Sequence, residues 1–133
     1  MKISHTIFAI VLPLILVACA TAYQPKGFSG GYSEIQLDPT TVRVTFEGNG
    51  YSNRSTVESY LIYRAAEVTI EFGFEWFIIN EREGETVWHP KYGKGGVMST
   101  AVIKMHHGQK PEGMLKSYDA RLVIATMGPI IKR

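Results

Sequence analysis

Residues 55–77, with the sequence STVESYLIYRAAEVTIEFGFEWF, decide the fold class of this chain. In most of this stretch, large or apolar side chains and one arginine recur at spacings of three and four, which predicts one buried face on a helix of about 17 residues. Ser55 and Glu58 have the spacing of a capping box that begins the helix, and Gly73 is suited to end it. The predicted buried face consists of Val57, Tyr60, Leu61, Arg64, Ala65, Val68 and Phe72.

The segment that follows the helix, residues 74–80, is apolar on both sides of an extended chain. Trp76 and Ile78 fall on one side, and Phe77 and Ile79 fall on the other. A strand with two apolar faces is typical of the centre of a sheet, where both faces are covered. We therefore expect a central strand directly after the helix.

Two further strands are predicted before the helix, at residues 33–37 and 41–47. In each, apolar residues alternate with polar ones, which is the pattern of a strand with one face on the core. We expect the inward positions to be Ile35, Leu37, Val42, Val44 and Phe46.

Beyond the central strand, residues 81–96 form a polar, glycine-rich stretch, and two more strands are predicted at residues 97–106 and 118–126. The predicted order is β-β-α-β-β-β. This order predicts the α+β class: a two-layer sandwich in which one main helix packs on an antiparallel or mixed sheet of about five strands. A chain of this length is suited to one domain, which we place at residues 32–133.

The N-terminal residues have the pattern of an export signal. Lys2 is followed by an almost unbroken apolar run at residues 7–20, which is interrupted by Pro13. A membrane-spanning helix needs about 20 apolar residues, so this shorter run predicts a signal peptide at residues 1–18.

The signal ends in Leu16-Val17-Ala18-Cys19, which resembles the lipobox of bacterial lipoproteins. The resemblance implies that Cys19 carries two or three acyl chains, enough for stable membrane anchoring. Cys19 is also the only cysteine, and lipidation would remove an unpaired thiol from an exported protein. In lipoproteins of this kind an Asp after the cysteine retains the protein in the inner membrane, whereas this chain has Ala20, which predicts the periplasmic face of the outer membrane. The alternative is an ordinary secretory signal.

Residues 19–31 are small, polar and glycine-rich, and we expect a lipidated N-terminus with a flexible tether there. Lys2 is the only Lys, Arg, Asp or Glu in the signal, so its removal lowers the formal net charge from +2 to +1. This charge and the envelope address argue against a nucleic-acid partner. The expected partners are the membrane, through Cys19, and an envelope protein.

The chain also resembles a known group of proteobacterial lipoproteins, the CC0125/CC1285 family. The resemblance rests on Phe46-Glu47-Gly48-Asn49, on Ser55-Thr56, on the helix motif from Tyr60 to Glu67, and on Gly73 with the aromatic strand after it. It spans about a third of the mature chain, by the residues quoted. The family has no assigned biochemical function, so the resemblance implies an envelope lipoprotein and no particular activity.

Catalytic and metal chemistry find little support in the sequence. His106 and His107 are neighbours on a predicted strand and should point to opposite faces, so one ion would not bind both, and we predict no metal site and no cofactor. No Gly-x-Ser-x-Gly elbow is predicted between a strand and a helix, and the cysteine is assigned to lipid. Glu81, Glu83 and Glu85 should form a solvated face. We predict that the protein is not an enzyme.

Four polar residues are candidates for structural or ligand contacts. Arg64 and Glu67 are one helical turn apart and are expected to pair, or to meet Arg43 if the helix covers that side of its strand. Asn49 lies in a Gly-Asn-Gly turn before the helix, which indicates either a turn and cap or an anion site at the helix N-terminus.

Trp88 and Tyr92 lie in the glycine-rich stretch and are candidate partner contacts, or else side chains of a long hairpin that fold back on the core. The leading functional hypothesis is a membrane-anchored, non-enzymatic interaction or structural module of the envelope. Two other hypotheses stay open: a small-ligand binder with a pocket between helix and sheet, and a hydrolase of envelope polymers.

Overall fold

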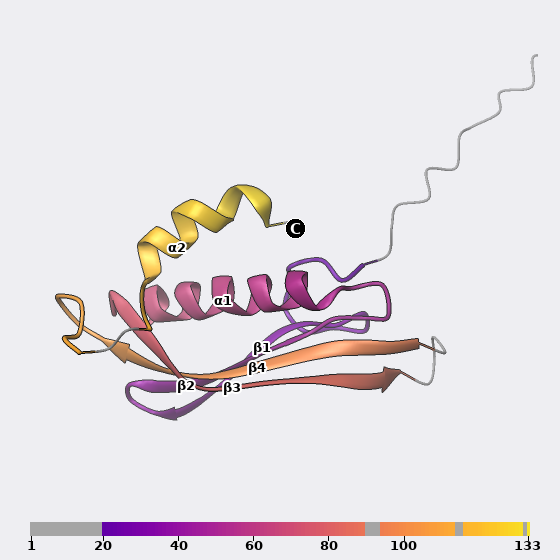
Figure 1. The fold of residues 1–133 in the computed structure, drawn as a ribbon, viewed down its shortest axis with the longest axis horizontal. Coiled ribbons are helices and arrows are strands. Elements are labelled where there is room, and N and C mark those ends of the chain that lie inside the picture. The colour runs from indigo at the N-terminus through magenta and orange to yellow at the C-terminus, as the bar shows by residue number, and fades with distance from the viewer. Residues whose placement is uncertain (1–19, 90–93, 114–115, 132) are drawn as a thin grey trace, which may run out of the picture.

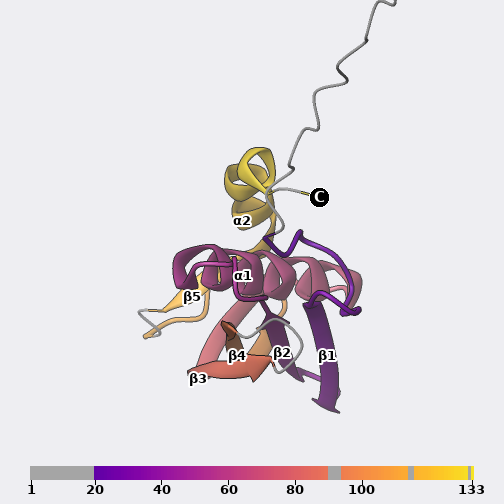
Figure 2. The ribbon, with the colours of Figure 1, turned by 90° about the vertical axis from the view of Figure 1, so that its right-hand side faces the viewer.

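The computed structural model describes residues 20–89, 94–113, 116–131 and 133. The predicted signal peptide and Cys19 lie outside these residues. The described chain forms five strands, two helices and one 3-10 turn, with both helices on one side of the sheet (Figures 1 and 2). They are β1 (Gly31–Asp38), β2 (Thr41–Glu47), α1 (Arg54–Glu71), β3 (Trp76–His89), β4 (Lys94–His106), β5 (Ser117–Asp119), α2 (Ala120–Met127) and η1 (Gly128–Ile130).

The sheet has the strand order β1-β2-β4-β3-β5, and every neighbouring pair is antiparallel. The predicted α+β class is confirmed, with one main helix on a five-stranded antiparallel sheet. The strand after α1 has a neighbour on each side, as expected of a central strand.

Helix α1 begins two residues earlier than the predicted capping box places it. Its N-cap is Asn53, whose side chain accepts the Thr56 N–H at 2.8 Å. The predicted capping box at Ser55 and Glu58 is therefore wrong, because Ser55 is already inside the first turn, where its carbonyl accepts the Ser59 hydroxyl at 2.9 Å. Asn is as good an N-cap as Ser, so the helix start is still encoded locally.

The predicted end of α1 at Gly73 is confirmed. Gly73 has φ +83°, a left-handed conformation that favours glycine, and its N–H donates to the Ile70 carbonyl at 2.9 Å. The Phe74 N–H donates to the Thr69 carbonyl at 2.9 Å. These two bonds form a Schellman motif that satisfies the last carbonyls of the helix.

The core lies between α1 and the sheet. Side chains that are almost fully buried come from β2, from the facing side of β4, from β3 and from the predicted face of α1. The inward residues of β2 are confirmed, whereas Phe72 at the end of α1 is 40 % exposed. The largest contributors are Val42, Val44, Phe46, Val57, Leu61, Val68, Phe77, Ile103 and Met105.

Strand β1 has the predicted alternation but the opposite orientation. Ile35 is 59 % exposed and Leu37 is 45 % exposed, so the prediction that they point inward is wrong. The register pairs Ile35 with Arg43 and Glu34 with Val44, which puts Glu34 on the covered face. The orientation follows from pairing with β2, because residues directly opposite each other in a sheet share a face.

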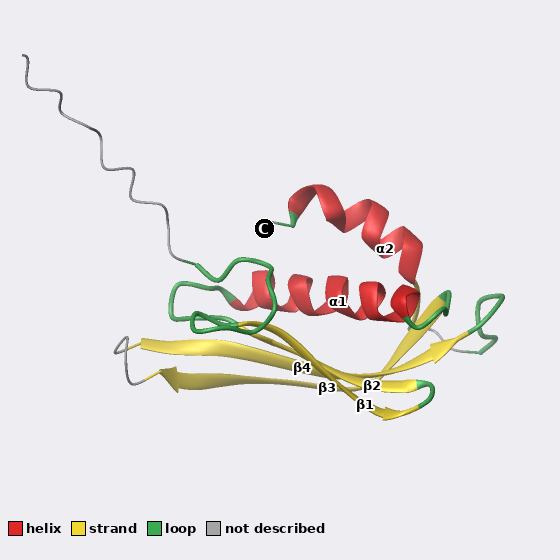
Figure 3. Cartoon of the chain, turned by 180° about the vertical axis from the view of Figure 1, so that it is seen from behind, coloured by secondary structure: helices red, strands yellow, loops and turns green. Residues whose placement is uncertain are grey.

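The polar stretch at residues 81–96 is mostly strand, not loop. β3 runs on to His89 and β4 starts at Lys94, which makes a long two-stranded hairpin (Figure 3). Residues 81–84 are exposed, and the register shifts between Ile79 and Glu81. A strand with little cover on either face has no reason to alternate apolar and polar residues, so the sequence pattern predicts no strand here.

The last predicted strand, residues 118–126, is wrong beyond its first two residues. β5 is three residues long, and Asp119 then caps α2 by accepting the Leu122 N–H at 3.0 Å. Ala120, Val123, Ile124 and Met127 form the inward face of α2, at helical spacing. This helix packs on α1 on the side away from the sheet, as a third layer (Figures 1 and 2).

The segment expected to be a flexible tether is part of the folded unit. Thr21 is 4 % exposed and Tyr23 is 5 % exposed. The Thr21 N–H donates to the Ser52 hydroxyl at 3.0 Å, and the Thr21 hydroxyl donates to the Ser29 carbonyl at 2.7 Å. A Cβ on Gly30 would lie 2.1 Å from the Glu47 carbonyl oxygen, so this close approach requires glycine. The domain therefore begins near Thr21, not near residue 32.

Candidate functional site

Arg64 is the best-connected polar residue of the described chain. It is 7 % exposed, and its guanidinium contacts carboxylates from β1 and from α1. It binds Glu34 through two nitrogens, at 2.7 and 3.3 Å, and Glu67 at 3.0 Å. It also binds Glu71, at 3.0 and 3.2 Å, and its Cζ lies 4.4 Å from the centre of the Tyr32 ring. We call these five residues the Arg64 cluster.

The Arg64 cluster extends to both ends of the described chain. The Tyr23 hydroxyl donates to the Glu67 carboxylate, and Arg133 lies 3.5 Å from the same carboxylate. The Tyr23 ring lies against aromatic rings of β1, β2 and α1, at 4.9 Å from Tyr32 and 5.1 Å from Tyr63. The cluster thus joins four separate segments of the chain.

The protonation states of the cluster follow from these contacts. Burial by itself lowers the pKa of Arg64, but hydrogen bonds to Glu34 and Glu67 outweigh it, and the pKa is raised above its ordinary value. Burial raises the pKa of Tyr23, and the hydrogen bond to Glu67 raises it further. Arg64 is therefore charged and Tyr23 neutral at every physiological pH.

These geometries confirm the predicted pairing of Arg64 with Glu67. All three carboxylates around Arg64 accept hydrogen bonds from it, so its charge is used within the fold. An arrangement of this kind is typical of a structural ion network. The contacts of Arg64 and Glu67 hold the N-terminal segment and β1 against α1.

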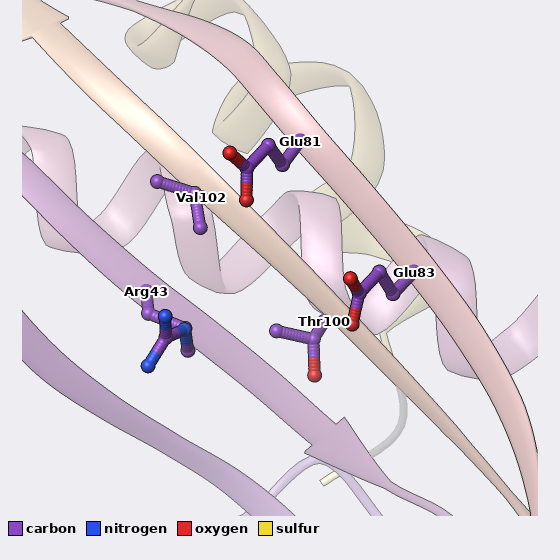
Figure 4. Close-up of a pocket in the computed structure, with 5 residues that line it drawn as sticks. All are labelled: Arg43, Glu81, Glu83, Thr100 and Val102. Carbon is purple, nitrogen blue, oxygen red and sulfur yellow. The ribbon is translucent and has the colours of Figure 1, made fainter.

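Arg43 does not join this cluster, because it lies on the other face of the sheet. There it borders a shallow hollow of about 220 Å³ across from Glu81 and Glu83 (Figure 4). Thr100 and Val102 of β4 form the floor between them (Figure 4). The hollow brings one basic and two acidic side chains to a face that neither helix of the described residues covers.

Asn49 serves the turn before α1. It is 9 % exposed, and its side-chain oxygen accepts the Tyr51 N–H at 3.0 Å and the Ser52 hydroxyl at 3.3 Å. Its own N–H donates to the Thr21 hydroxyl at 2.8 Å. The turn-and-cap interpretation is therefore confirmed for Asn49, while the cap itself is Asn53.

A larger groove of about 660 Å³ lies at the N-terminal end of α1. No local sequence pattern marks this groove, because it forms where the chain after α2 returns to the start of α1, beside the first described residues. Its lining comes from three segments: Ala20, Thr21 and Ala22; Asn53, Ser55, Thr56, Ser59 and Tyr60; and Ile130, Ile131 and Arg133.

The two adjacent histidines have separate surroundings. His107 stacks on Phe74 at 4.1 Å and lies 3.3 Å from Glu75, whose pKa is lowered by the Gly108 N–H and by His107. In His106, Nε2 is buried without a hydrogen-bond partner. Among the described residues, no group of three or more His, Cys, Asp or Glu side chains is placed to hold a metal ion.

Three predicted site residues lie outside what the structure describes. Cys19 and Tyr92 are not among the described residues, and for Trp88 only the backbone, in β3, is described. Within the described part, no helix is long and apolar enough to cross a membrane. No family model, curated protein or solved structure matches the chain.

Proposed function

We propose that this protein is a lipid-anchored envelope lipoprotein at the periplasmic face of the outer membrane, and that its domain is a non-enzymatic interaction module. The observation that carries the proposal is the asymmetry of the sheet. Among the described residues, both helices lie on one face, and the other face of β1, β2, β4 and β3 is left open (Figures 1 and 2).

The open face has features that suit a protein partner. At its β1 edge, Ile35 and Leu37 are exposed on a strand whose outer side is bridged by residues 24–26 at Tyr32, while beyond Tyr32 its described pairing is with β2 alone. An edge strand of this kind offers backbone hydrogen bonds to an extended segment of a partner. Next to it, the hollow with Arg43 on one side and two glutamates on the other offers both signs of charge.

The proposal that the module is non-enzymatic rests on the contacts that the candidate site residues make within the fold. Arg64 and Glu67 neutralise each other inside the fold, and Asn49 completes a turn. The family that the chain resembles, with its lipobox and helix motif, supports the envelope address. The proposed contacts of the open face are therefore binding contacts, and we assign no reaction to them.

The test is site-specific photo-cross-linking in intact cells. A photoreactive amino acid at Ile35 or at Arg43 should each give the same discrete cross-linked protein, identified by mass spectrometry. The matched control is Lys110, which is exposed in the loop after β4. If Ile35 and Arg43 give no product, or only the products seen from Lys110, the proposal fails.

A second candidate, a small-ligand binder, is favoured by the groove at the start of α1, whose volume of about 660 Å³ is in the range of ligand pockets. Native mass spectrometry of the purified mature protein tests it. A retained small molecule should be lost from a Ser59→Trp variant, which fills the groove. A protein that carries no small molecule even after incubation with envelope extract would dismiss this candidate.

A further inference from the structure

We propose that the exposed side of α2 and η1, together with the groove beside residues 20–22, rests on the phospholipid bilayer. The inference rests on the proposed lipid anchor at Cys19. It goes beyond the anchor by specifying how the domain is oriented: this surface contacts the membrane directly, and no flexible tether holds the domain away from it. We call this surface the α2 face.

The first argument is the shortness of the link between domain and anchor. Thr21 is buried and held by hydrogen bonds to Ser29, Asn49 and Ser52. Cys19 is two residues earlier, and an extended chain spans at most about 3.6 Å per residue, so the lipidated residue lies within about 7 Å of Thr21. The surface around Thr21 must therefore be close to the lipid headgroups.

The second argument is that the C-terminal end of the described chain lies beside residues 20–22. The groove that Ala20, Thr21 and Ala22 line has its opposite wall at Ile130, Ile131 and Arg133. In Figure 1 the first described residues and the end marked C lie close to each other, above the same end of α1. The chain after α2 is thus brought to the attachment point.

The third argument is the chemistry of the α2 face. Leu122 is 63 % exposed and Ile130 is 66 % exposed, and among the described large apolar side chains only Phe28, at 74 %, is more exposed. Exposed Arg121 and Arg133 flank them, and residues 120–133 contain no Asp or Glu. An apolar surface with basic residues around it is the pattern of a helix that lies in the interface of an anionic bilayer.

The order of the layers in the fold is compatible with this orientation. α2 lies on α1, and α1 lies on the sheet (Figure 2). A membrane that contacts the exposed side of α2 is therefore on the opposite side of the molecule from the open sheet face. Membrane contact would then turn the open face and its β1 edge toward the periplasm. The two proposed surfaces are compatible and do not compete.

Spin labelling of the mature, lipidated protein tests the inference. Cys19 is the only cysteine and is occupied by lipid in the proposed state, so a single introduced cysteine can be labelled selectively. The positions are Leu122→Cys and Ile130→Cys, with Ile35→Cys as the matched control, because it is 59 % exposed on the open face. The protein is reconstituted into vesicles of phosphatidylethanolamine and phosphatidylglycerol at a ratio of about 3:1, an anionic surface.

Electron paramagnetic resonance then compares the collision of each label with oxygen, which concentrates in the bilayer, and with a water-soluble nickel complex. For Leu122 and Ile130 we expect the ratio of oxygen to nickel collisions to be at least threefold higher than for Ile35. A ratio equal to that of Ile35 would overturn the inference. So would labels at Leu122 and Ile130 that are shielded from both reagents, because that result indicates protein contact at the α2 face.

Failure of the anchor is distinguishable from failure of the inference. If Cys19→Ala protein still incorporates a fatty-acid analogue in cells, the lipid anchor at this residue is wrong. If wild-type protein incorporates the analogue and floats with vesicles while Leu122 stays exposed to nickel, the anchor stands and the inference alone is wrong. A Leu122→Glu/Ile130→Glu variant should stay on vesicles through its lipid, but a label at Ala125→Cys should then become as exposed to nickel as Ile35.

Discussion

Two arginines on the same molecule, Arg64 and Arg43, show how differently the two faces of the sheet are built. Arg64, on the covered face, contacts three carboxylates and an aromatic ring and is 7 % exposed. Arg43, on the open face, is exposed and borders a shallow hollow. The covered face uses its charges to hold the fold together, and the open face leaves its charges to solvent or to a partner.

The largest expected effect comes from Arg64→Met. Removal of one partner from a buried ion network typically costs 3–5 kcal/mol, so the free energy of unfolding should fall by about 3–5 kcal/mol. The matched variant Arg43→Met should change it by less than about 0.5 kcal/mol, as expected of a surface position. Urea denaturation of both variants measures the difference. Equal losses would mean that the two faces do not differ in the way described.

The covered face was largely predictable because its signals are local. The helical spacing from Val57 to Val68 and the alternation of β2 each fix which side chains point inward, and the pairing of Arg64 with Glu67 needs only one helical turn. Two other contacts were not predictable: that of Glu34 with Arg64 and that of Tyr23 with Glu67. Their approach depends on the register of β1 and on the return of the N-terminal segment, which are set by contacts about 30 or more residues away.

The errors of prediction have physical reasons of the same kind. β1 alternates Ile35 and Leu37 with Glu34 and Gln36, and only the pairing with β2 decides which set faces the helix. At α2, helical spacing was present in Ala120, Val123, Ile124 and Met127, with Asp119 as a cap, but the β-branched run in its middle favoured a strand. The hollow with Arg43 and the groove beside Ala20 join segments far apart in the sequence, so no local pattern marks them.

The second prediction sharpens the comparison by testing the far end of the Arg64 cluster. Tyr23→Phe removes a hydroxyl that donates to a carboxylate, a hydrogen bond of the charged type, so the free energy of unfolding at pH 7 should fall by about 1.5–3 kcal/mol. A loss of this size also shows that residues 20–30 are folded. A loss below about 0.5 kcal/mol would mean that this segment is the flexible tether expected from its composition.

The same variant has a defined pH dependence. The pKa of Tyr23 is raised in the folded protein, so above pH 10, near the ordinary tyrosine value, the unfolded chain releases a proton that the folded chain keeps. Stability that depends on neutral Tyr23 is complete below about pH 10 and is lost as the pH rises further. The advantage of the wild type over Tyr23→Phe should therefore be constant from pH 7 to 9 and shrink by pH 11. An advantage that grows with pH would contradict the assignment.

The smallest expected effect on stability, and the sharpest test of the open face, comes from Ile35→Thr. Thr keeps the β-branched shape that suits a strand, and the side chain is 59 % exposed, so the free energy of unfolding should change by less than about 0.5 kcal/mol. The cross-link from Arg43 to the proposed protein partner should nevertheless be lost, because Ile35 lies opposite Arg43 on the same face. Lys110→Thr, the control, should leave both stability and cross-linking unchanged.

If Ile35→Thr destabilises the domain by more than about 1 kcal/mol, a surface assignment is untenable, because this is the cost of disturbing packed apolar residues. Its side chain would then belong to the fold, and the difference between the two faces would be smaller than the two arginines indicate.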